Sequence, residues 1–155
     1  KNNKINKYEN VYKILDEHYE IRYSLYVKRK KYILNELNKK LLILENKKNF
    51  INEVINKTIL VSECTKNDLL QQIFDKKYNL YDNNIIEEVS TFNRIKTKYD
   101  YLIKMPIYNM TSDKVDELNK EINNIKDEIN TILKKDIKEM WIDELNILLK
   151  YIKKK

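Results

Sequence analysis

The chain has 155 residues, contains no glycine, and has a single proline, Pro106. Glycine and proline are the residues that most readily end a helix, so long stretches here can be helical without a break. Residues 10–57 carry apolar or aromatic side chains every three or four positions, which is the helical period. Asn10 is a suitable N-cap for this helix, and Asn56 is a suitable residue at its C-terminal end. We therefore predict an outgoing coiled-coil helix over residues 10–57, about 70 Å long.

A second periodic stretch follows Pro106. Thr111 is its expected N-cap. Apolar residues then recur at alternating spacings of three and four positions, as in a coiled-coil seam. The period is lost near residues 134–136, where Asp136 and Glu139 have the spacing of a capping box. We predict a returning helix and a short final helix over residues 111–152. The predicted coiled-coil seam comprises Leu37, Leu41, Leu44, Leu118, Ile122, Ile125, Ile129 and Ile132.

Residues 58–110 do not continue the long helical pattern of the flanking stretches and are predicted to form a small globular knob. Residues 58–61 favour a β conformation, and Thr65 with Asp68 begins a short helix. Residues 79–98 lack a sustained period and are predicted to be an exposed connector. Pro106 would cost about 3 kcal/mol inside a helix, so it marks the corner before the return. The predicted fold is mainly all-α: a long antiparallel two-helix coiled-coil arm capped by the knob, with at most one short strand.

The net charge of +7 is confined to the first third of the chain. Residues 1–57 hold 14 basic and 7 acidic side chains, whereas residues 58–110 hold 7 of each and residues 111–155 hold 10 of each. This excess suits a surface facing a polyanion, and it equally suits a solvated helix face. The single cysteine and the absence of a long apolar run predict a reducing intracellular compartment and no membrane partner.

Four segments resemble, in order, the C-terminal arm of eukaryotic type IIA DNA topoisomerases. The first is KYENVYKILDEHYEIRYSLYVKRKKYILNEL, with matches at Lys7, Tyr8, Ile14, Leu15, Tyr19, Arg22, Tyr26, Arg29 and Lys30. The others are NFINEVINKTILV, matching at Phe50 and Ile51, YDYLIKMPIYNMT, matching at Tyr101, Leu102, Met105, Pro106 and Thr111, and DIKEMWIDEL, matching at Trp141 and Leu145. Family glycines are replaced by Asn56 and Lys104, and the connector is short. The Trp141 segment favours the eukaryotic or large-DNA-virus branch.

The resemblance implies that the knobs of two subunits meet to form the exit gate (C-gate), which retains and then releases a transported DNA duplex. It implies a homodimer through the knob, double-stranded DNA as a partner, and a nuclear location or the replication compartment of a large DNA virus. The parent enzyme would be an ATP-dependent topoisomerase using ATP and Mg. This segment is expected to hold no catalytic residue, cofactor or metal.

The candidate site residues follow from this hypothesis. The predicted dimer interface of the knob comprises Leu69, Ile73, Phe74, Tyr101, Leu102, Met105, Ile107 and Tyr108, although the knob's own core can claim part of this set. Possible weak DNA-facing residues are Lys28, Arg29, Lys30 and Lys31. Arg22 and Tyr23 match the residue types of the Arg-Tyr pair that cleaves DNA in these enzymes. They lie inside a predicted helix with no acidic metal cluster nearby, so we do not expect them to form a cleavage site. Trp141 is expected to anchor the final helix on the first.

Two other classes of function stay open. A coiled-coil adaptor or tether unrelated to DNA would dimerise along its helices and be insensitive to salt. A basic helical nucleic-acid-binding module would show salt-dependent affinity for DNA on its own.

Overall fold

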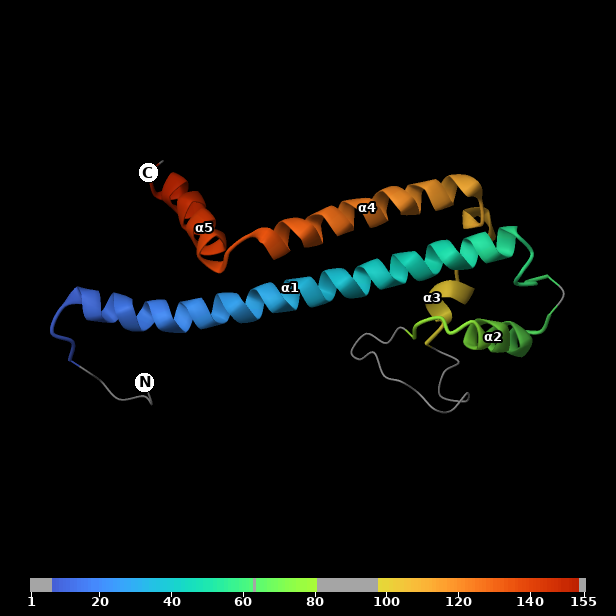
Figure 1. The fold of residues 1–155 in the computed structure, drawn as a ribbon, viewed down its shortest axis with the longest axis horizontal. Helices are drawn as coiled ribbons and strands as arrows, with labels where there is room; N and C mark the ends of the chain where they lie inside the picture. The colour runs from blue at the N-terminus through green and yellow to red at the C-terminus, as the bar shows by residue number, and fades with distance from the viewer. Residues whose placement is uncertain (1–6, 63, 81–97, 154–155) are drawn as a thin grey trace. The chain divides into compact units, whose positions relative to one another are not determined.

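The computed structural model describes residues 7–62, 64–80 and 98–153. Its elements are α1 (Val11–Ile55), α2 (Lys66–Asp75), α3 (Asp100–Ile103), the 3-10 helix η2 (Ile107–Asn109), α4 (Ser112–Lys134) and α5 (Ile137–Ile152) (Figure 1). Within the described ranges there is no β-strand, which confirms the mainly all-α class. The β-favouring residues 58–61 form bends and irregular structure. The predicted connector lies outside the described residues, apart from residues 79, 80 and 98.

The helix ends follow from local chemistry that the sequence makes visible. The Asn10 side chain accepts a hydrogen bond from the Lys13 amide at 3.0 Å, so the predicted N-cap of α1 is confirmed. Thr65 and Asp136 each form a complete capping box at the start of α2 and α5. The Thr111 hydroxyl accepts from the Lys114 amide at 3.3 Å. These side chains satisfy amide groups that a helix start otherwise leaves without partners.

Two helices end on a lysine in the left-handed conformation. Lys57 and Lys77 both have φ of 57°. The Lys57 amide donates to the Val54 carbonyl oxygen, and the Thr58 amide donates to the Glu53 carbonyl oxygen. The corresponding bonds follow α2, from the Lys77 amide to the Phe74 carbonyl and from the Tyr78 amide to the Ile73 carbonyl. This is the Schellman pattern, built here without the glycine that usually occupies the left-handed position.

The chain divides into two compact units. The first unit contains residues 1–36 and 129–155, and the second contains residues 37–128. Both α1 and α4 contribute residues to each unit, whereas α2 and α3 belong to the second and α5 to the first.

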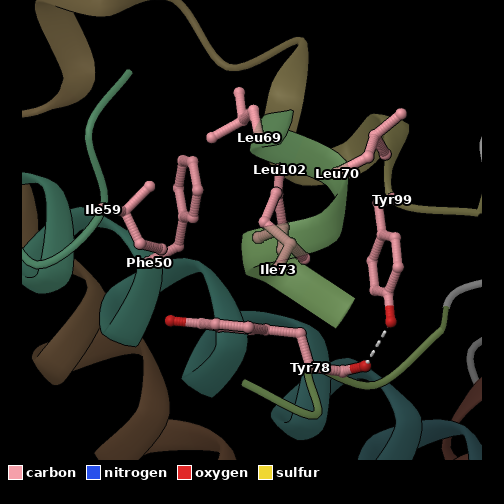
Figure 2. Packing of buried hydrophobic residues seen from close by; sticks show 8 residues of the cluster. All are labelled: Phe50, Ile59, Leu69, Leu70, Ile73, Tyr78, Tyr99 and Leu102. Atoms are coloured by element: carbon pink, nitrogen blue, oxygen red, sulfur yellow. Dashed lines mark hydrogen bonds between the residues drawn. The ribbon is translucent and has the colours of Figure 1, made fainter. Parts of the chain in front are cut away.

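The second unit has one apolar core formed by α1, α2, α3 and the segments between them. Leu69, Leu70 and Ile73 of α2 share a buried cluster with Phe50 of α1 and Leu102 of α3, and Leu70 lies on the side of Tyr99 (Figure 2). Ile59, Tyr78 and Tyr99 complete the cluster. The Tyr99 hydroxyl donates to the Tyr78 carbonyl at 3.0 Å, and the Tyr78 hydroxyl donates to Glu53 at 2.9 Å, so both buried phenols keep hydrogen-bond partners.

Within the second unit, α4 lies along the opposite side of α1 from α2 (Figure 1). Leu118, Ile122 and Ile125 of α4 are buried, as is Leu44 of α1. The Lys126 ammonium lies 2.8 Å from the Glu45 carboxylate, which joins the polar margins of the same two helices. Here α1 therefore packs on two sides, against the core cluster on one and against α4 on the other.

The left-handed conformation of Lys77, after α2, leads to a specific prediction about stability. Replacing Lys77 by glycine removes the steric cost of a side chain at positive φ, so we expect the free energy of unfolding to rise by about 1 kcal/mol. Its neighbour Lys76 has φ of −79° and provides the comparison, although its ammonium also pairs with the Glu53 carboxylate at 3.2 Å. Lys76→Gly gains no steric relief and should lower stability by about 0.5 kcal/mol or more. Urea unfolding measures both changes, and a destabilised Lys77→Gly variant would contradict the assignment.

Candidate functional site

The surface next to Pro106 is the most exposed apolar feature among the described residues of the second unit. Pro106, with φ of −60° and ψ of 141°, ends the α3 segment and leads into η2. The Asn109 amide donates to the Pro106 carbonyl at 2.9 Å, which closes the 3-10 turn. This turn leaves Ile107 83% exposed and Tyr108 75% exposed. Two adjacent large apolar side chains facing solvent are typical of a contact surface.

An open groove of about 750 Å³ lies beside Ile107. The end of α1, residues 57–62 and residues 103–110 form its walls, and most of the lining side chains are apolar: Val54, Ile55, Ile59, Leu60, Val61, Ile103, Met105, Ile107 and Met110. Lys57 and Ser62 are the polar members of the lining. We call this groove, together with Ile107 and Tyr108, the tip surface.

The predicted interface residues are divided by the structure between the core and the tip surface. Leu69, Ile73 and Leu102 are buried in the core cluster, where a second copy cannot reach them. Phe74, Tyr101 and Met105 are half-buried against that cluster, and Met105 also lines the groove. Ile107 and Tyr108 are exposed. Of the predicted set, the tip surface therefore uses Met105, Ile107 and Tyr108.

Three exposed apolar residues of the tip surface, Ile55, Leu60 and Val61, were not among those predicted from the sequence. Nor were the buried or half-buried groove residues Val54, Ile59, Ile103 and Met110. Ile55 sits at the end of the long periodic helix, and Leu60 and Val61 belong to the run interpreted as β-favouring. The sequence did contain a signal for Leu60 and Val61. They directly follow Ile59, which is buried, in a segment too short to bury three large apolar side chains. Ile55, Leu60 and Val61 are all exposed and line the groove.

Tyr101 has a structural role in the second unit. Its hydroxyl accepts a hydrogen bond from the Asn46 amide group at 2.9 Å and donates to the Asn79 carbonyl at 2.7 Å. Burial raises the pKa of this phenol to about 12. The side chain thus stays neutral near pH 7 and joins α1, α3 and the segment after α2.

The first unit contains the four cations predicted to face DNA, and two of them make contacts within the chain. The Arg29 guanidinium lies 2.7 Å from the Glu144 carboxylate of α5. The Lys30 ammonium donates to the Leu133 carbonyl at 3.0 Å and to the Lys135 carbonyl at 2.7 Å. Lys30 therefore satisfies carbonyl groups at the carboxyl end of α4, where a cation is favoured. Lys28 and Lys31 are exposed.

Aromatic stacking joins α5 to α1 in the first unit. The Trp141 ring lies 5.4 Å from that of Tyr19 and 5.6 Å from that of Tyr26, both stacked. The expected anchoring of the final helix by Trp141 is confirmed. The Tyr26 hydroxyl also donates to Glu144 at 2.5 Å, so the same tyrosine makes an apolar and a polar contact with α5.

The Glu144 carboxylate is the electrostatic centre of this contact. The hydrogen bond from Tyr26 and the charge of Arg29 hold the pKa of Glu144 below its ordinary value. Burial and the bond to Glu144 raise the pKa of Tyr26. Both shifts favour the pair observed here, a charged carboxylate and a neutral phenol.

The remaining predicted seam residues are half-buried. Leu37 and Leu41 lie on α1 in the second unit, and Ile129 and Ile132 lie on α4 in the first. Their partial exposure contrasts with the full burial of Leu118, Ile122 and Ile125.

Arg22 and Tyr23 lie in the interior of α1 and take part in packing. The Arg22 guanidinium lies 5.2 Å from the centre of the Tyr26 ring, and the Tyr23 ring stacks on Tyr19 at 5.9 Å. Among the described residues, no group of three or more His, Cys, Asp or Glu side chains could hold a metal ion. In that part of the chain, the pair therefore lacks the acidic metal cluster that phosphoryl transfer would need beside it.

Comparisons with known proteins place these features in a family. Residues 1–146 match the family model described as DNA gyrase/topoisomerase IV, A subunit. DNA topoisomerase 2 of Penicillium chrysogenum is 27% identical over 92% of this chain and 10% of its own length, and that of Invertebrate iridescent virus 6 is 30% identical over 92% and 11%. The crystal structure of the Plasmodium falciparum topoisomerase II DNA-binding, cleavage and re-ligation domain superposes with a TM-score of 0.82, at 26% identity over 98% of this chain and 22% of that one.

The fold is an all-α element shared with type II topoisomerases. The chain belongs to the family of DNA gyrase/topoisomerase IV A subunits. It spans about a tenth of the length of the curated relatives it matches. No helix in the described part of the chain is both long and apolar enough to cross a membrane.

The Glu144 contact predicts a pH dependence of stability. Because the folded-state pKa of Glu144 is lowered, its stabilising effect is present above the ordinary glutamate pKa of about 4.3 and is lost as the pH falls below it. We expect Glu144→Gln to cost under about 1 kcal/mol at pH 7, since the ion pair is largely exposed. The cost should shrink towards zero near pH 3. Thermal unfolding of both proteins from pH 3 to 8 measures this, and a cost that grew on acidification would contradict it.

Proposed function

We propose that this chain is the exit gate and coiled-coil strut of a type II DNA topoisomerase, and that it homodimerises through the tip surface. The observation that carries the proposal is the tip surface itself, an apolar groove flanked by the exposed Ile107 and Tyr108 in a chain of the topoisomerase family. A two-fold interface uses the same patch on both copies, so an apolar projection beside an apolar groove is well suited to self-association.

A gate must open as well as close, which limits how strong this contact can be. Much of the apolar surface of the second unit is already used by its own core. The surface left for a partner is the groove and the two side chains of η2, which suits a modest interface rather than an obligate one. This fits an element that retains a DNA duplex and then releases it.

The parent polypeptide would supply the chemistry. Under this proposal the ATP and Mg sites and the cleavage tyrosine lie outside residues 1–155. The long helices would act as a strut beside the transported double-stranded DNA, in the nucleus or in the replication compartment of a large DNA virus. Of the four cations predicted to face DNA, Lys28 and Lys31 are the two available for loose attraction of phosphate, because Arg29 and Lys30 hold α5 and α4.

The proposal predicts that charge at the tip abolishes dimerisation. In an Ile107→Asp, Tyr108→Asp variant, two carboxylates would be desolvated in the interface, and we expect self-association to weaken by about a hundredfold or more. The control variant Lys66→Asp, Lys120→Asp changes two exposed residues of the same unit away from η2. Sedimentation equilibrium measures all three proteins.

An association constant that is unchanged in the tip variant would reject the interface. If self-association is lost instead in a Leu37→Asp variant, the dimer forms along the helices, as expected for an adaptor or tether.

The proposal also predicts weak, salt-dependent DNA binding by the isolated chain. Non-specific contacts of this kind have dissociation constants of about 10⁻⁴ to 10⁻⁶ M at physiological salt. Lys28→Ala with Lys31→Ala should flatten the slope of log affinity against log salt by up to about 2, whereas Lys66→Ala with Lys120→Ala should not. Fluorescence anisotropy with a labelled duplex measures the slopes. Tight, sequence-specific binding would instead favour the nucleic-acid-binding module.

A further inference from the structure

The final helix, α5, is apolar over most of its circumference. Its 16 residues read IKEMWIDELNILLKYI. At 100° per residue, Glu139, Asp143, Asn146 and Lys150 fall on one narrow polar arc. A surface helix normally has a single apolar stripe, and a helix that is apolar on more than one side is typically covered by more than one neighbour.

One apolar side of α5 packs against α1 within the first unit. Trp141 stacks on Tyr19 and Tyr26, and Glu144, one turn further along, accepts from Tyr26 and pairs with Arg29. Ile137 and Met140 lie on the same side and are half-buried. This face accounts for every contact described above between α5 and α1.

A second apolar stripe on α5 is left largely uncovered by the described residues of the first unit. Ile142, Leu145, Leu149 and Ile152 step three, four and three positions, so they form a continuous line along the helix. These four side chains are 44–59% exposed. The equivalent line on α4, formed by Leu118, Ile122 and Ile125, is buried in the second unit. We call this line the outer stripe of α5. Ile147, Leu148 and Tyr151 of the same helix are also exposed, so the stripe is distinguished by its regular spacing rather than by exposure alone.

We propose that the outer stripe of α5 is the docking surface for an apolar helix face from the same polypeptide, outside residues 1–155. This inference rests on the proposed function, in which the chain is one part of a longer topoisomerase. The matched relatives are about ten times the length covered here, so ample polypeptide exists in such proteins to provide the covering segment.

Size argues against a second copy as the occupant. A helix of 16 residues is about 24 Å long and about 10 Å wide, so pairing two outer stripes would bury roughly 500 Å² in total. Stable association between separate proteins generally needs about 1,200 Å² or more. A segment of the same polypeptide does not bear the entropic cost of bringing two molecules together, so a contact this small is sufficient.

Cysteine accessibility tests the docking surface. In a Cys64→Ser background, Leu145→Cys is placed on the outer stripe and Asn146→Cys on the polar arc directly beside it. Both are made in the 155-residue chain and in the full polypeptide that contains it, and their rates of maleimide modification are compared. We expect Leu145→Cys to react at least about tenfold more slowly in the full polypeptide, because labelling must await local opening of the docked face. Asn146→Cys should react at similar rates in both.

Two results would overturn the inference. One is equal labelling of Leu145→Cys in the two proteins. The other is protection that appears in the 155-residue chain as its concentration rises, which would assign the stripe to a second copy. Repeating the experiment in the Ile107→Asp, Tyr108→Asp variant separates this test from that of the gate, because the tip surface and α5 share no residue.

Discussion

Packing against α1 is the interaction on which the rest of the structure depends. In the second unit, Phe50 of α1 enters the core cluster with α2 and α3, while Leu44 of the same helix is buried on the side of α4. In the first unit, Tyr19 and Tyr26 of α1 stack on Trp141 of α5. A helix of 45 residues cannot draw its stability from propensity alone. It also depends on tertiary partners, and different elements provide them in each unit, although large side chains near its start, such as Val11 and Tyr12, remain exposed.

The apolar surfaces left over are as informative as those that are buried. In the second unit they are concentrated at the tip surface, beside the corner that Pro106 makes. In the first unit they include the outer stripe of α5, on a helix otherwise held by Trp141 and Glu144, and exposed side chains of α1 such as Val11 and Tyr12. The tip surface and the outer stripe are compact lines or patches of large side chains, and both suit partners that would be supplied by assembly into something larger: a second copy at the tip and the parent polypeptide at α5.

Charge plays a local role in this chain. The excess of basic residues in the first third of the sequence suggested a DNA-facing surface, yet Arg29 and Lys30 are engaged by Glu144 and by carbonyl groups at the end of α4. Their energetic contribution is to orient α4 and α5 on α1 within the first unit. The cations left for a polyanion are therefore fewer than the sequence count implies.

The sequence alone determined where the longer helices α1, α2, α4 and α5 begin, because capping and periodicity are local, whereas the short elements α3 and η2 were not predicted. Asn10, Thr65, Thr111 and Asp136 act through amides two or three residues away, so their roles were predictable. The match to a family was also readable from four short segments. Tertiary structure decided which apolar side chains remain exposed: Leu69 and Ile107 are both large aliphatic residues, but only Leu69 belongs to the buried cluster that α1, α2 and α3 form together. Burial depends on contacts between segments far apart in the chain, and periodicity carries no information about those.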